Sequence, residues 1–374
     1  MSISIRLHRI EVPLVRPFRT SFGTETMRDL ILVQARTSDG LSGWGECVAM
    51  DWPGYSAEYT DGAIDVIRRH LLPALAGLSP DADPVAVRAR MAPILGHPMA
   101  KAALETALLD LWLRRREQSL AQYLGAVTDR VDCGVSVGIP ASQTLAELLA
   151  ETQSYIDQGY RRIKLKIEPG WDVEPVAAVR DRWPGMPLQV DANQAFRRTD
   201  GPLLARLDDL DLLLIEQPLP EDDWYGHVLL AQQLRTPVCM DESITSLASA
   251  DSALALGAAS IINIKPGRVG GYLTARDIHD LCRSRGVPVW CGGMLETGIG
   301  RAANLALAAL PGFTLPGDTS ASSRYYAQDV TEPFMLRDGQ LRVPTGPGIG
   351  VDPLPDVLAD MTTWSTDLVL EESA

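Results

Sequence analysis

The central part of the chain alternates short apolar runs with longer stretches in which apolar residues recur at helical spacing. Each run is four or five residues long and rich in Val, Ile and Leu, which predicts buried strands at 133–137, 163–167, 188–191, 212–216, 238–241, 261–265, 287–291 and 313–316. The stretches between them begin near residues 143, 173, 199, 224, 247, 270 and 298 and have the period of amphipathic helices. Strands joined through helices run parallel, so the pattern predicts a parallel β/α repeat.

Two architectures accommodate such a repeat: a closed (β/α)8 barrel and an open doubly wound sheet. Eight units, together with the absence of a G-x-G-x-x-G fingerprint, favour the barrel. The predicted fold class is therefore α/β, with a (β/α)8-type (modified TIM) barrel at residues 129–322.

The sequence before the barrel has α+β character. Residues 4–48 alternate apolar and polar positions, with Ser38-Asp39-Gly40 as a turn, which predicts an antiparallel meander. Residues 57–77 and 99–117 have helical periodicity. We assign an N-terminal α+β domain to residues 1–128. The turn-rich segment 323–374 is expected to pack back on this domain and complete it.

Composition and charge narrow the class of protein. The formal net charge of −14 argues against a nucleic-acid or anionic-membrane surface. The five cysteines include no C-x-x-C pair, which is typical of a reduced cytosolic protein. No apolar stretch reaches the ~18 residues of a membrane span, and the first residues lack a signal-peptide block. We expect a cytoplasmic protein that assembles as a homo-oligomer.

A charged residue ends each of five consecutive predicted strands: Lys166, Asp191, Glu216, Asp241 and Lys265. A charge at a buried strand end is costly unless it is paired or binds a metal. In barrels of this type, catalytic groups lie at the carboxyl ends of strands. The two lysines are on the second and sixth strands, which are opposite each other in an eight-strand ring. The three carboxylates lie along the arc between them.

The three carboxylates predict a metal site. They would repel one another unless neutralised. An all-oxygen set without His or Cys beside it suits a hard cation, Mg²⁺ or Mn²⁺, rather than Zn²⁺. The alternative is that each carboxylate is only a salt-bridged residue at the end of its strand. Because three carboxylates occur in register on consecutive strands, we favour the metal site.

Lys164 and Lys166 point to the same side of their strand because side chains at i and i+2 share a face. Two neighbouring ammonium groups lower each other's pKa, which would make a neutral general base accessible near pH 7. A divalent ion with opposed amines suits one reaction class. The metal binds a substrate carboxylate, a lysine removes the adjacent carbon-bound proton, and the resulting enediolate is held by the metal. Elimination or racemisation would follow.

The motifs around these positions resemble the enolase superfamily, in its muconate-lactonising-enzyme subgroup, over nearly the whole chain. They are KLK at 164–166, DAN at 191–193, IEQP at 215–218, DES at 241–243 and NIKPGRVGG at 263–271. Segments 134–138, 164–173, 290–298 and 316–320 look like o-succinylbenzoate synthases that also racemise N-succinyl or N-acyl amino acids.

The resemblance implies that the N-terminal domain caps the barrel and that Asp191, Glu216 and Asp241 bind Mg²⁺, for which Mn²⁺ or another divalent cation can substitute. It implies that Lys166 is the base, then the acid, of a syn dehydration in menaquinone biosynthesis. Lys265 would steady the enediolate and serve as the second acid/base in racemisation of a small-molecule carboxylate.

Sister activities differ at single residues. A mandelate-racemase-like His–Asp pair is absent, since none of the five histidines is at the sixth or seventh strand end. The Asp-x-Asp of dipeptide epimerases is reduced to Asp318 alone. A dedicated N-acylamino acid racemase and a muconate-type cycloisomerase remain alternatives, and a barrel kept only for binding is a non-enzyme alternative.

Six further positions are candidate substrate contacts. Lys164 and Asn193 share the inward parity of the strand-end charges, and Ser136 ends the first strand. The paired glycines before Met294 permit close backbone approach, so N–H groups at Gly293 and Met294 are candidates for a distal carboxylate. Loops 18–24, with Arg19, and 50–55 are expected to close over the mouth, although ordinary interdomain packing is the alternative.

Arg268 lies three residues beyond Lys265. We hypothesise that it lowers the pKa of Lys265 or orients this lysine, which favours racemisation over dehydration. A purely structural arginine is the alternative.

Overall fold

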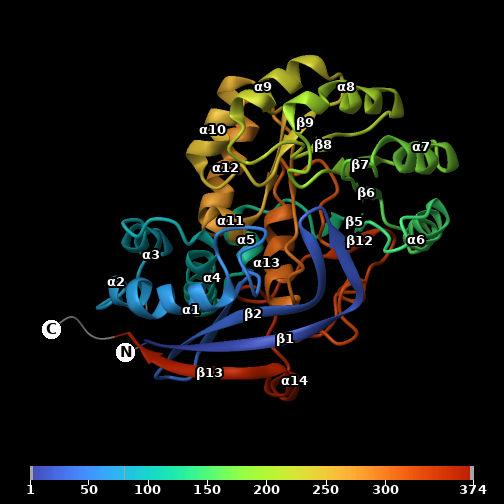
Figure 1. Cartoon of the computed structure of the whole chain (residues 1–374). Helices are drawn as coiled ribbons and strands as arrows, with labels where there is room; N and C mark the ends of the chain where they lie inside the picture. Colours follow the sequence, from blue (N-terminus) through green and yellow to red (C-terminus); the bar gives the residue numbers. More distant parts are fainter. Residues whose placement is uncertain (1–2, 80, 371–374) are drawn as a thin grey trace.

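The computed structural model describes residues 3–79 and 81–370 and contains two main sheets (Figure 1). A four-stranded antiparallel sheet with helices forms the lower layer in this view, and a curled seven-stranded parallel sheet with its helices forms the upper part. In the described residues no helix is long and apolar enough to cross a membrane.

The antiparallel sheet has the strand order β13-β1-β2-β3 and belongs to what we call the cap. Its strands are β1 (Ile3–Thr20), β2 (Gly23–Thr37), β3 (Ser42–Cys47) and β13 (Thr362–Val369). The alternating sequence gives the sheet two apolar faces, because successive side chains point to opposite sides. One face, with Ile5 and Ile31, packs on the cap helices, and the other, with Ile10 and Leu30, joins the core of the barrel.

The cap helices cover one side of this sheet. They are α1 (Thr60–Val66), the π-helical turn η1 (Ile67–Leu71), α2 (Leu72–Ala74), α3 (Pro84–Met91) and α4 (Pro98–Arg114). Helix α4 lies directly on β3. A Cβ at Gly43 or Gly45 would lie 2.3 or 2.1 Å from backbone atoms of α4, so only glycine permits this approach.

The parallel sheet has the order β11-β10-β9-β8-β7-β6-β5, which is the chain order of a barrel. Its strands are β5 (Gly134–Val137), β6 (Arg162–Lys166), β7 (Leu188–Asp191), β8 (Ile215–Glu216), β9 (Val238–Met240), β10 (Ile261–Ile264) and β11 (Val289–Cys291). The principal helices are α6 (Leu145–Asp157), α7 (Val173–Arg182), α9 (Trp224–Gln233), α10 (Leu247–Leu256), α12 (Tyr272–Ser284) and α13 (Gly298–Ala308). The helix predicted near residue 199 is divided into three short helical segments, the 3-10 helix η2 (Arg198–Asp200), α8 (Gly201–Leu204) and the 3-10 helix η3 (Ala205–Leu210).

The eighth predicted strand, 313–316, is not a regular strand. Isolated bridges join Phe313 to Val289 on one side and Gly317 to Cys133 on the other. Gly134 N–H donates to Gly317 O at 2.8 Å, and Asp318 N–H donates to Cys291 O at 2.9 Å. The segment therefore closes the ring between β11 and β5 without a full ladder, because Pro316 has no N–H to contribute. The (β/α)8-type fold class is confirmed with this irregular closing segment.

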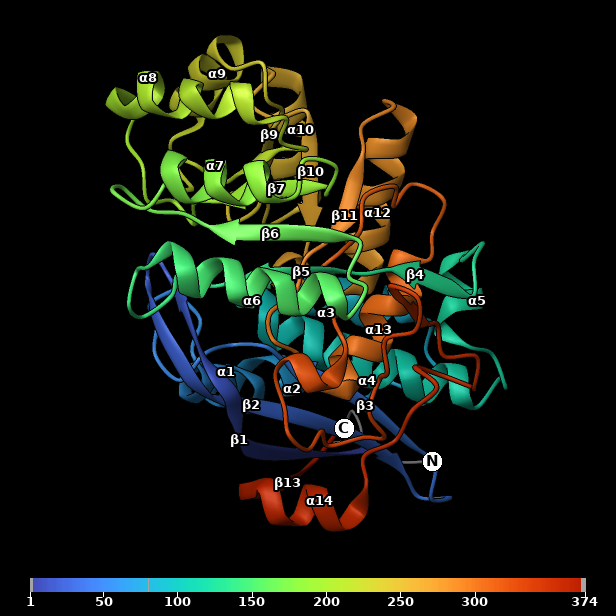
Figure 2. The same ribbon diagram turned by 90° about the vertical axis from the view of Figure 1, so that its right-hand side faces the viewer.

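The last part of the chain returns to both units. Strand β12 (Gln340–Arg342) pairs with β4 (Arg130–Asp132), and β13 pairs antiparallel with β1 from Ser4–Val369 onward. Helix α14 (Pro355–Met361) lies beside the cap sheet. The hairpin of β1 and β2 extends from the cap toward the barrel strands (Figure 2). This hairpin occupies the position where the sequence predicts a loop at 18–24.

Candidate functional site

The charged strand ends meet at one rim of the curled sheet. Lys166 pairs in register with Asp191, and Asp191 pairs with Glu216. Asp241 follows β9 directly, and Lys265 follows β10 directly. All five side chains are buried, with no more than 7% exposed. The structure thus brings the five sequence-predicted residues together, since parallel strands in register end at the same rim.

Each carboxylate of this cluster hydrogen-bonds an ammonium group. The pairs are Lys166 Nζ–Asp191 Oδ2 at 2.6 Å, Lys265 Nζ–Asp241 Oδ2 at 2.9 Å and Lys164 Nζ–Glu216 Oε2 at 3.0 Å, with Lys164 Nζ also 3.3 Å from Asp191 Oδ2. Buried charges need such partners, because an unpaired one is strongly unfavourable.

The pKa of Lys164 differs from the sequence-based expectation. Burial lowers this pKa, but the carboxylates of Asp318, Glu216 and Asp191 outweigh burial and raise it above its ordinary value. The expectation that Lys164 and Lys166 lower each other's pKa therefore does not hold for Lys164, whose pKa is raised. Asp318 is the reason, since its Oδ2 lies 2.6 Å from Lys164 Nζ.

The carboxylates are held in opposite ways. Burial and the neighbouring Asp191 and Asp241 raise the pKa of Glu216 well above its ordinary value. Burial also raises the pKa of Asp241, but Arg268 and Lys265 outweigh it and hold that pKa far below its usual range. Like-charge crowding is therefore concentrated at Glu216, which a bound cation would relieve.

The donor chemistry fits a hard divalent cation. The three carboxylates are buried and adjacent, and the thiol of Cys239, which pairs with Glu216 across β8 and β9, is buried as well. Within the described residues no cluster of three or more His, Cys, Asp or Glu side chains has metal-binding spacing as it stands. The carboxylate oxygens form ion pairs with the lysines instead. The ligand type, three carboxylates, is nevertheless the one that Mg²⁺ prefers.

Lys265 is held by Tyr55, from the cap loop 50–55 that the sequence predicts to close over the mouth. Tyr55 Oη accepts hydrogen bonds from Lys265 Nζ at 3.2 Å and from Arg268 Nη1 at 2.9 Å. Arg268 also lies 2.6 Å from Asp241 Oδ1 through Nη2 and donates through Nε to Ile244 O at 3.0 Å. Arg268 thus reaches Lys265 through two shared partners. Burial and the charge of Arg268 lower the pKa of Lys265, but Asp241 and Tyr55 outweigh them and leave that pKa above its ordinary value.

Two predicted substrate contacts lie near the strand ends, and they differ in whether their polar groups are already hydrogen-bonded. Asn193 Oδ1 accepts from Lys166 Nζ at 2.6 Å, and its Nδ2 donates to Glu242 Oε1 at 3.0 Å. Asn193 has φ +41°, a left-handed conformation that asparagine tolerates. Ser136 is buried, and its Oγ has no partner in the described residues. The hydroxyl of Ser136 is therefore free for a water molecule or a ligand.

Arg19 is engaged in docking the cap on the barrel. Its Nη2 lies 2.8 Å from Glu168 Oε1, and its backbone oxygen accepts from Ile139 N–H at 3.1 Å. Ser21 Oγ donates to Asn193 O at 2.9 Å, and the Phe18 ring centre lies 5.8 Å from Lys166 Nζ. The hairpin tip therefore covers the strand ends.

The loop after β11 approaches Lys265 closely. A Cβ at Gly292 would lie 2.7 Å from Lys265 Cε, whereas at Gly293 the nearest atoms would be 3.3 Å away, on Asp318. Met294 N–H already donates to Glu296 Oε2 at 2.9 Å, and the Met294 side chain is buried in the apolar core of the cap. Of the two predicted N–H donors, only that of Gly293 has no acceptor in the described part of the chain.

Sequence reasoning gave no site role to Asp318, Asn263 and Glu242, and it named Tyr55 only as part of the loop 50–55. Asp318 Oδ1 lies 2.8 Å from Arg162 Nη2, so its carboxylate joins Arg162 and Lys164. Asn263 Nδ2 donates to Glu216 Oε1 at 2.7 Å. Burial and the adjacent Asp241 and Asp191 raise the pKa of Glu242 to about 8. Inward parity with Lys265 on the same strand was the available signal for Asn263.

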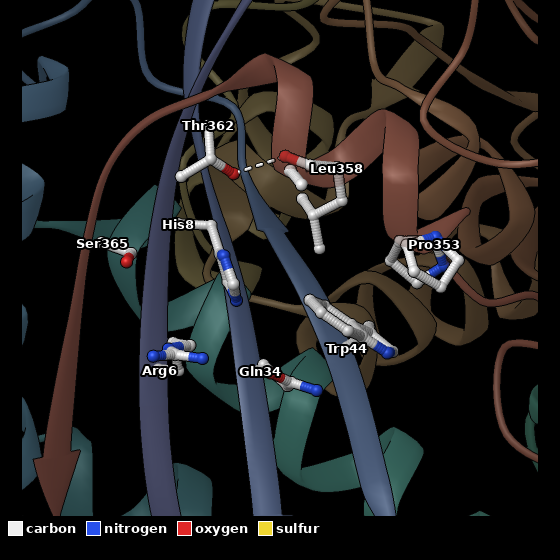
Figure 3. A pocket seen from close by; sticks show the side chains of 10 residues that line it. Arg6, His8, Gln34, Trp44, Pro353, Leu358, Thr362 and Ser365 are labelled. Atoms are coloured by element: carbon white, nitrogen blue, oxygen red, sulfur yellow. Dashed lines mark hydrogen bonds between the residues drawn. The ribbon is translucent and has the colours of Figure 1, made fainter.

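A cavity of about 440 Å³ on the cap lies apart from this rim (Figure 3). His8 and Trp44 line it from the sheet, and Leu358 and Pro353 line it from the α14 side. None of the predicted site residues is among its lining residues, so we place the candidate site at the strand ends.

Comparison with known proteins agrees with the geometry. Residues 2–125 match the family model described as mandelate racemase / muconate lactonizing enzyme, N-terminal domain, and residues 147–357 match the model described as enolase C-terminal domain-like. An N-succinylamino acid racemase from Amycolatopsis sp is 58% identical over 96% of this chain and 97% of its own. An o-succinylbenzoate synthase from Geobacillus kaustophilus is 47% identical over 94% of both chains. A solved enolase-superfamily structure from Listeria innocua has a TM-score of 0.94 at 40% identity, covering 98% of this chain and 99% of that one.

Proposed function

Because the chain belongs to the mandelate racemase / muconate lactonizing enzyme family of the enolase superfamily, we propose that it removes the α-proton of a carboxylate substrate with the help of a divalent metal ion. The observation that carries this proposal is the pair of buried lysines, Lys166 and Lys265, on β6 and just after β10. Lys166 hydrogen-bonds Asp191 and Lys265 hydrogen-bonds Asp241, and both carboxylates lie on strands between the two lysines.

The reaction is that of an o-succinylbenzoate synthase, a syn dehydration of 2-succinyl-6-hydroxy-2,4-cyclohexadiene-1-carboxylate within menaquinone biosynthesis. The same site would racemise N-succinylamino acids. Relatives with both names, 47% and 58% identical, support the pair of activities. The alternatives are a dedicated N-acylamino acid racemase and a muconate-type cycloisomerase.

Asp191, Glu216 and Asp241 would hold Mg²⁺, or Mn²⁺ or another divalent cation in its place. The bound ion would supply positive charge to the substrate carboxylate and so acidify its α-carbon. Asn263 orients Glu216, and Arg268 orients Asp241, through the bonds described above.

Lys166 acts as the base. As a neutral amine it would take the α-proton from one face of the substrate, and the Phe18 ring, whose centre lies 5.8 Å from Nζ, would help to exclude water there. In dehydration, Lys166 then returns this proton to the departing hydroxide, and water leaves. In racemisation, Lys265 delivers its own proton to the opposite face of the α-carbon.

The remaining candidates bind and orient. Lys164, fixed by Asp318 and Glu216, contributes positive charge beside the substrate carboxylate. We retain Asn193, Ser136, Arg19, Gly293 and Met294 as proposed contacts. For Arg19 the ion pair with Glu168 favours a role in closing the hairpin. Met294 would contribute by shaping the loop, because its N–H donates to Glu296 and its side chain is buried in the apolar core of the cap. We also propose a homo-oligomer in the cytoplasm.

The test is a direct assay of both substrates on the purified protein with and without Mg²⁺. Lys166→Ala should abolish both reactions and the α-proton exchange in D₂O of the enantiomer whose α-proton faces Lys166. Lys265→Ala should abolish racemisation and retain part of the dehydration. Exchange of both enantiomers by Lys166→Ala would remove the base assignment, and activity in the presence of excess chelator would remove the metal.

A further inference from the structure

We propose that Glu46, on strand β3 of the cap, is a positioning residue that fixes the loop after β11 and thereby sets recognition of the substrate's distal carboxylate. The proposal rests on the proposed function, since it assumes that the distal group of an N-succinyl substrate approaches Gly293. It adds a residue of the cap whose side-chain hydrogen bonds, in the described part of the chain, go to Thr297 and Gly300 and not to the lysines or carboxylates of the rim.

The loop 292–297 is held by side chains along almost its whole length. Met294 N–H donates to Glu296, Tyr326 Oη donates to Leu295 O, and Arg301 Nη2 donates to Glu296 O at 2.8 Å. Bonds of this kind fix a backbone that has no ladder of its own. The loop is therefore a preformed surface rather than a mobile one.

Glu46 holds the end of this loop where it enters α13. Its Oε1 accepts from Thr297 N–H at 3.0 Å, and its Oε2 accepts from Thr297 Oγ1 at 2.6 Å and from Gly300 N–H at 2.9 Å. A carboxylate is favourable there, because the first N–H groups of a helix lack intrahelical partners and carry partial positive charge. The cap thus supplies the N-terminal carboxylate of a barrel helix.

The conformation that Glu46 secures is strained. Leu295 has φ +57°, a left-handed value that is unfavourable for a residue with a Cβ. Such a residue stays in place only where the surroundings impose it. Glu46 accepts from Thr297, two residues beyond Leu295, and Tyr326 donates to the Leu295 oxygen. The strained residue is therefore fixed by one contact from the cap and one from the barrel.

The strained loop determines which donor faces the substrate. Since Glu296 takes the Met294 N–H, Gly293 provides the one uncommitted N–H of the pair. Gly292 lies against Lys265 Cε, so the same loop borders the second acid/base. If Thr297 shifts, Gly293 moves relative to Lys265. The distal carboxylate of an N-succinyl substrate then loses its hydrogen-bond donor. A substrate without a distal carboxylate is little affected.

The experiment compares N-succinyl and N-acetyl derivatives of one amino acid by α-proton exchange in D₂O. The variants are Glu46→Gln, whose single side-chain oxygen can replace Oε1 or Oε2 but not both, so that an NH₂ group faces the donors of the other oxygen, and the milder Thr297→Val. Thr297→Ser restores the hydroxyl. Glu58→Gln is the matched control, because Glu58 is also a buried cap carboxylate that accepts backbone N–H bonds, from Met99 at 2.8 Å and Ala100 at 3.1 Å, away from the loop.

We expect Glu46→Gln and Thr297→Val to lower the ratio of kcat/KM for the N-succinyl over the N-acetyl substrate about tenfold, the loss of one hydrogen bond to a charged group. The effect should be in KM, and amide exchange at 293–297 should speed up. Thr297→Ser and Glu58→Gln should keep the ratio. An equal loss for both substrates, or an unchanged ratio, overturns the inference alone. A wild-type protein that exchanges neither substrate overturns the proposed function and this inference with it.

Discussion

Alanine substitutions at the two neighbouring glycines of the loop after β11 should have different effects, because the two positions differ in their distance from Lys265. In Gly292→Ala the new Cβ would lie 2.3 Å from Asn263 Oδ1 and 2.7 Å from Lys265 Cε. Carbon atoms in contact are about 3.5–4.0 Å apart, so Lys265 or the loop must move by about 1 Å. In Gly293→Ala the nearest atoms are at 3.3 Å, on Asp318, and a shift of a few tenths of an ångström suffices.

The displacement translates into a rate. A misplacement of about 1 Å in a reacting group costs about 10²-fold, which corresponds to about 2.7 kcal/mol in activation free energy. We therefore expect Gly292→Ala to lower racemisation about 100-fold. Exchange catalysed by Lys166 on the other face should fall less, because Lys166 does not touch Gly292.

The assay follows racemisation by polarimetry and α-proton exchange by NMR in D₂O, with Gly293→Ala as the control. Far-ultraviolet circular dichroism and the melting temperature establish that both variants are folded. Racemisation by Gly292→Ala within threefold of the wild type would refute the close packing of Lys265 on this loop. Equal losses in both alanine variants would refute the argument from distance.

Two further predictions concern charged groups away from the loop. Arg268→Gln should reduce racemisation more than dehydration, because it removes the contacts with Asp241 and Tyr55 that hold Lys265; parallel loss of both rates would leave Arg268 a structural residue. Glu105 is buried with Oε2 unpartnered and Oε1 accepting from Leu273 N–H at 3.0 Å, and burial raises its pKa to about 7. Its folded pKa lies above the unfolded value, so stability is lost as pH rises from about 4.5 through 7, on the order of 3 kcal/mol at pH 8. Urea unfolding should find Glu105→Gln more stable than the wild type at pH 8 and near equal at pH 5, and destabilisation of equal size at both pH values would contradict this.

The rim of the barrel was predictable because its residues follow a period. Parallel strands joined by helices end at one edge, so Lys166, Asp191 and Glu216 could be placed side by side from the spacing of apolar runs alone. The eighth segment was only partly predictable. Its apolar residues resemble a strand, but Pro316 and the bridges at Phe313 and Gly317 leave it irregular.

The contacts from the cap had no such period. Tyr55 and Lys265 are 210 residues apart, and Glu46 and Thr297 are 251 apart. Their meeting depends on how two units dock, which local hydrophobic patterning does not specify. The pKa expectation for Lys164 failed for the same reason, because Asp318 comes from a segment whose path the pattern left open.

The cap sheet is completed by a strand from the C-terminal part of the chain, because β13 pairs with the first residues of β1. Ser4 pairs with Val369, and Arg9 pairs with Trp364. At synthesis rates of 5–20 residues per second, β1 waits roughly 20–70 s for this neighbour. Until then one edge of β1 is open to pairing with another nascent chain. Slow translation, or loss of residues 362–369, should therefore cause newly made protein to aggregate. This aggregation would precede any measurable loss of catalytic activity.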